Sequence, residues 1–403
     1  MTDTDTAVSS MITYYDLTER LPTFAKLETD DELSRYAAQR WRLFSELLGV
    51  SPHVFKGADV IEFGPDSGEN ALVFAQWGAR LTLVEPNLKA HEFINAYLRR
   101  FGLTDRLAEL SSLPIERYVP TRTFDAVVAE GFIFSVRPEA LWMDLFARLL
   151  RPGGYAVISY YDRTSFGLEA LWKLLFAALA SMTGGRRSVE LAWRLYATKW
   201  NSIRHTRAFE SWVMDVLENP FIRLKYSLDA AEVVRQMAAR GLSLSGSWPS
   251  YRDSLAVYWY KNETPPEARL ARTRRFIDRN CLGHLFGTTM FLCGDEDEVA
   301  AVVRATREFV ESIDAGYETP DVAGITRCAR AIERLRLLVS RAHIYAEDPV
   351  ARPGAAAMLD GVEQALRLIL AGDTQGLVDL CNSDEALISH WGNPNHFAVF
   401  HKD

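Results

Sequence analysis

The stretch Val60-Ile61-Glu62-Phe63-Gly64-Pro65-Asp66-Ser67-Gly68 decides the fold of this chain. Its first residues belong to a short apolar strand, Ala58–Phe63, and a helical pattern runs from Glu69 to Trp77. A strand that ends at a glycine loop and leads into a helix lets the backbone approach a ligand, while the helix N-terminus supplies unpaired N–H donors. The stretch therefore predicts a nucleotide-binding loop.

Alternating strands and helices extend outward from this loop. Helices are expected at Leu88–Phe101 and Pro138–Leu150. Further strands are expected at Arg80–Glu85, Ala108–Leu110, Phe124–Ala129 and Tyr155–Tyr161. Strands and helices that alternate at these lengths predict an α/β fold, with a parallel sheet and helices on its faces.

An acidic residue ends the second strand. The Glu85 carboxylate can accept hydrogen bonds from both hydroxyls of a ribose, because its two oxygens lie side by side. Dinucleotide dehydrogenases share this logic, but their fingerprint needs a glycine in the middle of the loop and a third glycine close behind. Here Asp66 stands in the middle, and no glycine follows Gly68 until Gly78. The dehydrogenase interpretation is therefore excluded.

Three motifs together resemble the class I S-adenosylmethionine-dependent methyltransferases: residues 60–68, Gly78–Pro86, and Leu149–Tyr155 before the fifth strand. The resemblance covers about residues 57–162 and resumes at 228–260, where a helix and two strands look like the family's closing antiparallel hairpin. It implies a Rossmann-like, doubly wound, seven-stranded sheet whose last strand is antiparallel. It also implies S-adenosyl-L-methionine as cofactor.

The resemblance implies roles for individual residues at the ends of the strands. Glu62 and the glycine loop should lie along the methionine moiety, Glu85 should hold the ribose, and Glu130 should line the sulfonium and the substrate. An ordinary loop role stays open for Ser112 and Leu113, which match the adenine contact. The cofactor-binding residues expected in this way are Glu62, Gly64, Pro65, Gly68, Glu85, Pro86, Ser112, Leu113 and Glu130. The sequence departs from the family at Asp66, where a glycine is usual, and at Ser111–Ser112, where an Asp is frequent.

Candidate catalytic groups follow from the chemistry of methyl transfer. Transfer from a sulfonium is an in-line displacement, in which the protein aligns the acceptor and excludes water, and a general base helps a hydroxyl or a carbon acid. The candidate bases are Tyr15 on the N-terminal segment, Tyr160 at the end of the fifth strand, His205 and His396. A packing role stays open for each tyrosine, and a surface role for each histidine. We expect no metal site, because Cys281, His284 and Cys293 have no second ligand pair at zinc-finger spacing.

The length predicts several domains. We expect an N-terminal helical segment (1–50) that forms a lid over the cofactor, a cofactor-binding core (51–162 and 228–261), a helical cap insertion (163–227) and a mainly helical C-terminal domain (262–403). Six of the ten tryptophans lie between residues 172 and 259, which favours either an apolar substrate pocket or the core of a small cap.

Composition narrows the function. The net charge of -8 argues against a general nucleic-acid binder, and the most apolar stretch, Leu168–Met182, is shorter than the ~20 residues of a membrane span. Four cysteines in 403 residues suit a reducing, cytoplasmic protein. We therefore expect a cytoplasmic enzyme of small-molecule biosynthesis, with a homodimer formed through the helical C-terminal domain. Open alternatives are a protein methyltransferase, another S-adenosylmethionine reaction such as aminocarboxypropyl transfer, and a non-catalytic binding protein.

Overall fold

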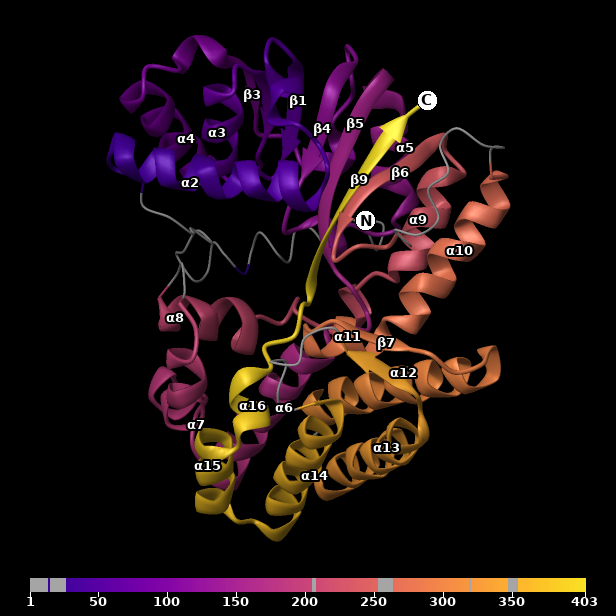
Figure 1. Ribbon diagram of the computed structural model, residues 1–403. Coiled ribbons are helices and arrows are strands. Elements are labelled where there is room, and N and C mark those ends of the chain that lie inside the picture. The colour runs from indigo at the N-terminus through magenta and orange to yellow at the C-terminus, as the bar shows by residue number, and fades with distance from the viewer. Residues whose placement is uncertain (1–13, 15–26, 205–207, 253–263, 319, 347–353) are drawn as a thin grey trace. The chain divides into compact units, whose positions relative to one another are not determined.

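The computed structural model describes residue 14 and residues 27–204, 208–252, 264–318, 320–346 and 354–403 (Figure 1). The chain forms two compact units. The sheet unit consists of Met1–Tyr160, Ala231–Leu270 and His396–Asp403, and the helical unit consists of Tyr161–Ala230 and Ala271–Asn395.

The sheet unit is built on a seven-stranded sheet with the order β3-β2-β1-β4-β5-β9-β6. Its strands are β1 (Asp59–Phe63), β2 (Arg80–Val84), β3 (Leu107–Ser111), β4 (Phe124–Ala129), β5 (Leu150–Tyr161), β6 (Leu242–Trp248) and β9 (Asn395–Lys402). Strands β1 to β5 pair in parallel, and β9 runs antiparallel to β6. The predicted α/β fold with a seven-stranded, doubly wound sheet is confirmed. The strand order reverses between β1 and β4, and ligands of open α/β sheets bind at the carboxyl edge of such a switch point.

The antiparallel strand comes from the end of the chain. β9 lies between β5 and β6 (Figure 1), with Ala398, Val399 and Phe400 buried. Lys402 fixes its far end by donating hydrogen bonds to the carbonyls of Ala147 and Leu150, at 2.6 and 2.8 Å. The sequence placed the closing hairpin within residues 228–260. Its first expected strand corresponds to β6, and the second, at 255–260, lies outside the described residues; among the described strands, β9 takes the position beside β6.

Helices of the sheet unit follow the predicted pattern. Their bounds are α2 (Asp30–Arg42), α3 (Glu69–Gln76), α4 (Leu88–Arg100), α5 (Ala140–Leu149) and α9 (Ala230–Ala238). α2 starts at a capping box in which Thr29 accepts from the Glu32 amide and the Glu32 carboxylate accepts from the Thr29 amide. After α2, a π-helical turn carries Phe44 into a cluster of aromatic rings with Phe55 and Phe74. This packing attaches the N-terminal helix to the core of the sheet unit.

The helical unit contains a helix that is buried on almost every side. α6 (Gly167–Met182) is apolar on nearly every face, with Glu169 and Lys173 as its charged residues, which predicts a buried position. The helices α6, α12, α13 and α14 pack in succession (Figure 1). The others in this unit are α7 (Val189–Asn201), α8 (Phe209–Trp212), α11 (Cys281–Phe286), α12 (Glu296–Glu318), α13 (Val322–Arg341), α14 (Ala355–Ala371), α15 (Thr374–Ser383) and α16 (Glu385–Ser389), and α10 (Pro266–Arg279) begins in the sheet unit and ends here. Strands β7 (Met290–Leu292) and β8 (Ile344–Ala346) pair in a two-stranded sheet that the sequence did not predict.

Along the described parts of the chain, no helix combines the length and the apolar character that crossing a membrane requires. Likewise, no three or more His, Cys, Asp or Glu side chains of those parts form a group that could hold a metal ion.

Candidate active site

The predicted cofactor residues gather at the carboxyl edge of the sheet. The paired positions Phe63 and Val84 end β1 and β2, Phe63 also pairs with Ala129 in β4, and Val84 pairs with Ser111 in β3. Residues that follow these positions, and Glu62 just before Phe63, therefore lie along one edge. The sheet brings together in this way Glu62, Gly64, Pro65, Gly68, Glu85, Pro86, Ser112, Leu113 and Glu130. Ser112 and Leu113 are exposed, whereas Glu62 and Glu85 are buried.

The glycine loop needs its glycines for conformation and for space. Gly64 and Gly68 have φ angles of +61° and +93°, which side chains rarely adopt. A Cβ at Gly64 would lie 2.6 Å from the Phe132 ring, and one at Gly68 would lie 2.8 Å from Cγ1 of Ile94. Asp66 also has a positive φ, +52°, which explains how a residue other than glycine occupies the middle of the loop, because Asp tolerates the left-handed region. The departure from the family pattern therefore preserves the loop conformation.

Glu85 is held by the loop that it faces. Its Oε2 accepts from the Asp66 amide at 3.1 Å, and its Oε1 accepts from the Asn87 amide at 2.8 Å. Burial raises the pKa of Glu85 to about 7, against the opposing effect of these two hydrogen bonds. Each carboxylate oxygen can accept a further hydrogen bond, so the group is oriented and still able to bind two hydroxyls.

Glu62 is a buried carboxylate that is short of partners. It is 1% exposed, and its Oε2 has no hydrogen-bond partner among the described residues. Burial raises its pKa well above the usual range, and the neighbouring Glu130 adds to the shift. Leaving a buried carboxylate oxygen unpaired is costly unless a ligand completes it. The position therefore suits a cationic hydrogen-bond donor.

Glu130 already has a partner that the sequence did not reveal. Arg40, on α2, binds it through both ends of the guanidinium: Nη1 donates to Oε2 at 2.8 Å and Nη2 to Oε1 at 2.6 Å. Asn70 donates to the same Oε2 at 3.4 Å, and Tyr36 donates to Asn70 at 2.7 Å. A signal was present, because Arg40 follows Tyr36 and precedes Phe44 at helical spacing on a face that is otherwise apolar.

Two predicted bases meet inside the sheet unit through a third residue. Tyr160 and Tyr251 share a hydrogen bond of 2.8 Å between their hydroxyls, and the Tyr251 hydroxyl lies 2.6 Å from Nδ1 of His396. All three side chains are fully buried. Tyr251 was missed because it lies just after β6, far from both partners in sequence. The other two candidates, Tyr15 and His205, lie outside the described residues.

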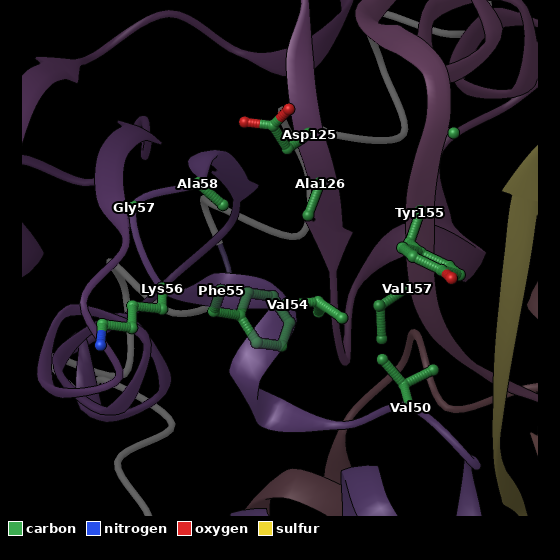
Figure 2. A pocket seen from close by; sticks show the side chains of 11 residues that line it. Val50, Val54, Phe55, Lys56, Gly57, Ala58, Asp125, Ala126, Tyr155 and Val157 are labelled. Carbon is green, nitrogen blue, oxygen red and sulfur yellow. The ribbon is translucent and has the colours of Figure 1, made fainter.

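A hollow of about 410 Å³ lies at the opposite, amino edge of the sheet (Figure 2). Its walls include Phe55, Val157 and Tyr155, and none of the predicted site residues lines it. Asp125, on its rim, accepts from Arg151 and from the Asp59 amide, both at 2.8 Å. The Arg-Pro-Gly-Gly motif that begins at Arg151 thus links two strands at this edge, away from the site.

Comparison with known proteins agrees with the geometry. The model of the methyltransferase domain family matches residues 33–245, more than half of the chain. A search of curated proteins gives no match.

Three solved structures are similar to parts of this chain. The N-methyltransferase NodS from Bradyrhizobium japonicum WM9, in complex with S-adenosyl-L-homocysteine, is 19% identical, with 37% of this chain and 74% of NodS covered and a TM-score of 0.28. TehB from Haemophilus influenzae is 16% identical, with 34% and 43% covered and a TM-score of 0.27. PKMT2 from Rickettsia typhi is 15% identical, with 57% and 46% covered and a TM-score of 0.42. This chain thus spans less than half the length of TehB and of PKMT2.

Since these structural likenesses are partial, the assignment depends on the family match and on the strand order and loop described above. The chain belongs to the methyltransferase domain family and is a class I S-adenosylmethionine-dependent methyltransferase.

Proposed function

We propose that this enzyme methylates a small molecule by in-line transfer. The proposed cofactor site is supported by Glu62, a buried side chain beside the glycine loop. One of its two carboxylate oxygens has no hydrogen-bond partner among the described residues. The observation that favours a small acceptor is the fully buried row of Tyr160, Tyr251 and His396. Only an acceptor small enough to enter the interior of the protein can reach such groups.

Each predicted cofactor residue then has a task. Glu62 accepts a hydrogen bond from the ammonium group, and Glu85 accepts from the ribose hydroxyls while the Asp66 and Asn87 amides keep it in place. Gly64, Pro65 and Gly68 form the cradle that lets the backbone come close. The exposed pair Ser112 and Leu113, with Pro86, borders the adenine. When bound, S-adenosyl-L-methionine supplies an activated methyl group on its sulfonium.

The buried row provides a path for the acceptor's proton. As an acceptor hydroxyl gains the methyl group, its proton moves to the oxygen of Tyr160, the Tyr160 proton moves to Tyr251, and the Tyr251 proton moves to Nδ1 of His396. The second and third of these transfers follow hydrogen bonds that already exist, at 2.8 and 2.6 Å. Histidine suits the end of the path because its usual pKa lies near neutrality. Tyr15 and His205 stay proposals for the same role.

The compartment and the oligomeric state are proposed from the cysteines and from one exposed helix. Four free cysteines in an acidic chain support a reducing, cytoplasmic compartment. The helical unit exposes Val322 and Leu337 on α13, at 72% and 51%, which supports association of two copies through this helix. Size-exclusion chromatography with light scattering on wild type and on Val322→Asp tests the dimer: a single monomeric mass for both proteins refutes it.

The acceptor class is tested by labelling. Purified enzyme and S-adenosyl-L-methionine with a labelled methyl group are added to a lysate, which is then separated into small molecules and macromolecules. We expect label in the small-molecule fraction, and none when Glu62→Gln replaces the wild type. Label confined to protein would instead establish a protein methyltransferase, and cofactor binding without any labelled product would indicate a binding protein.

A further inference from the structure

Glu62 lies in a group of buried carboxyls that it shares with Glu69 and Glu130. Glu69, at the start of α3, accepts from the Ser67 hydroxyl at 2.7 Å, and Glu130 follows β4. The charges of both carboxyls act on Glu62, and so does the charge of Arg40 on α2. Arg40 therefore faces more carboxyls than one guanidinium can neutralise.

Arg40 is committed to Glu130. Its Nη1 and Nη2 donate to the two carboxylate oxygens of Glu130, at 2.8 and 2.6 Å. The guanidinium also lies over two aromatic rings, 5.2 Å from the centre of Phe44 and 5.6 Å from that of Phe74. The bidentate bond and the stacking fix its orientation, so these two nitrogens bind Glu130 rather than Glu62.

The balance of charge around Glu62 is acidic. The titratable and charged groups that face it are Tyr36 and Arg40 from α2, Glu69 from α3, Glu85 after β2 and Glu130 after β4. The Tyr36 hydroxyl is neutral, because burial raises its pKa to about 12. Burial and the charge of Glu130 raise the pKa of Glu62 well above its usual range, and Arg40 opposes them. A buried carboxyl without a cation of its own takes up a proton more readily than it stays ionised.

We propose that Glu62 holds a proton in the empty site and releases it to the solvent when the ammonium of the cofactor binds its unpaired Oε2. The inference depends on the proposed cofactor site. The incoming ammonium supplies the cation that Glu62 lacks, so the ionised carboxylate becomes the favoured form. The O–H bond of the acid breaks, its proton passes to the buffer, and an N–H···O hydrogen bond forms. Because one proton is displaced, binding should strengthen by up to about tenfold for each unit by which the pH rises.

Calorimetry in several buffers counts the released protons. The heats of binding of S-adenosyl-L-homocysteine, which carries the same ammonium, are measured at about pH 6.5, where a free α-amino group is mainly charged. Buffers that differ in ionisation enthalpy then give the number of protons released for each ligand bound. Methylthioadenosine has the same adenine, ribose and thioether but no amino-acid part, so it engages Glu85 without engaging Glu62. Wild type should release about one proton more with S-adenosyl-L-homocysteine than with methylthioadenosine, and in Glu62→Gln the two numbers should be equal.

Stability without ligand gives an independent readout. An amide has nearly the shape of a protonated carboxyl, so Glu62→Gln should be at least as stable as wild type in urea unfolding at pH 7. Because the folded-state pKa of Glu62 is raised, its contribution to stability is fully present below pH 4.5 and is lost as the pH rises. The variant should therefore gain on wild type with rising pH. A variant that is clearly less stable than wild type at pH 7 would show that Glu62 is ionised in the empty site and would overturn the inference.

The controls separate this inference from the proposed function. Glu92→Gln removes an exposed carboxyl from α4 and should release as many protons as wild type with each ligand. If Glu62→Gln does not bind, the comparison of the two ligands on wild type still decides. Equal proton release with both ligands on wild type would overturn the inference and leave the cofactor site standing. Wild type that binds neither ligand would overturn the proposed cofactor site and the inference together.

Discussion

Replacing Glu85 with glutamine gives a sharp test of the ribose contact, because the structure predicts opposite effects on binding and on stability. Glu85 is 7% exposed and accepts from the Asp66 and Asn87 amides at 3.1 and 2.8 Å. A glutamine keeps one accepting oxygen and places an NH2 group where the second oxygen was. One of the two amides then loses its partner, and one ribose hydroxyl loses an ionised acceptor.

The binding loss follows from hydrogen bonds to a charged group, each of which contributes about 1.5–3 kcal/mol. Losing one of them should weaken S-adenosyl-L-homocysteine binding by roughly 10- to 100-fold. The wild-type affinity should also fall as the pH drops below 7, because the pKa of Glu85 is about 7 and the protonated acid is a poorer acceptor. The glutamine variant has no such group and should lose that part of the pH dependence.

The stability effect has the opposite sign. Because burial raises the folded-state pKa of Glu85 from 4.5 to about 7, its contribution to stability is fully present below pH 4.5 and is lost as the pH rises through 7. The loss is on the order of 3 kcal/mol. Without ligand, Glu85→Gln should therefore gain stability relative to wild type between pH 5 and 8, as urea unfolding at several pH values measures. Unchanged affinity together with a constant stability difference would refute the assigned role of Glu85.

Three further substitutions test other parts of the structure. Tyr251→Phe breaks the proton path from Tyr160 to His396 and should lower kcat by roughly 10- to 100-fold, with an unchanged Kd for the cofactor. Equal kcat values in the variant and the wild type would remove this proton path from the mechanism. In Gly64→Ala the added Cβ would lie 2.6 Å from the Phe132 ring, so the variant should bind the cofactor more weakly and have a lower Tm. The control Gly153→Ala has a φ of +80° and no atom within 4 Å of the added Cβ, so it should show backbone strain alone. Similar Tm shifts in the two variants would count against the clash. Lys199→Met removes a buried amino group that donates to the carbonyls of Leu387 and His390 at 2.8 and 2.6 Å, and it should cost the folded state about 3 kcal/mol in urea unfolding because these buried carbonyls lose their donor. A loss below about 1 kcal/mol would contradict that role.

The strands and the glycine loop could be predicted because their signals are local. Val60 to Phe63 form an apolar run in which Glu62 is the one polar residue. Gly64 and Gly68 then mark a turn with positive φ angles, which few residue types adopt. Glu85 and Glu130 followed from position, since each stands directly after an apolar strand. Parallel pairing then placed them at one edge without any knowledge of side-chain contacts.

The parts that could not be predicted depend on packing between distant segments. Arg40 and Glu130 are 90 residues apart, and Tyr251 and His396 are 145 apart. Nothing in the alternation of β9 indicates that it pairs with β6, because strand pairing is decided by the three-dimensional arrangement. β7 and β8 have only three residues each, too few for a periodic pattern to appear.

The most direct test of the account is a crystal structure with S-adenosyl-L-homocysteine bound. We expect the ligand along the carboxyl ends of β1, β2 and β4, with its ammonium at hydrogen-bond distance from Oε2 of Glu62 and its ribose hydroxyls on Glu85. Density for the ligand in the hollow at the amino edge of the sheet, or at the carboxyl edge with Glu62 still unpaired, would contradict the account.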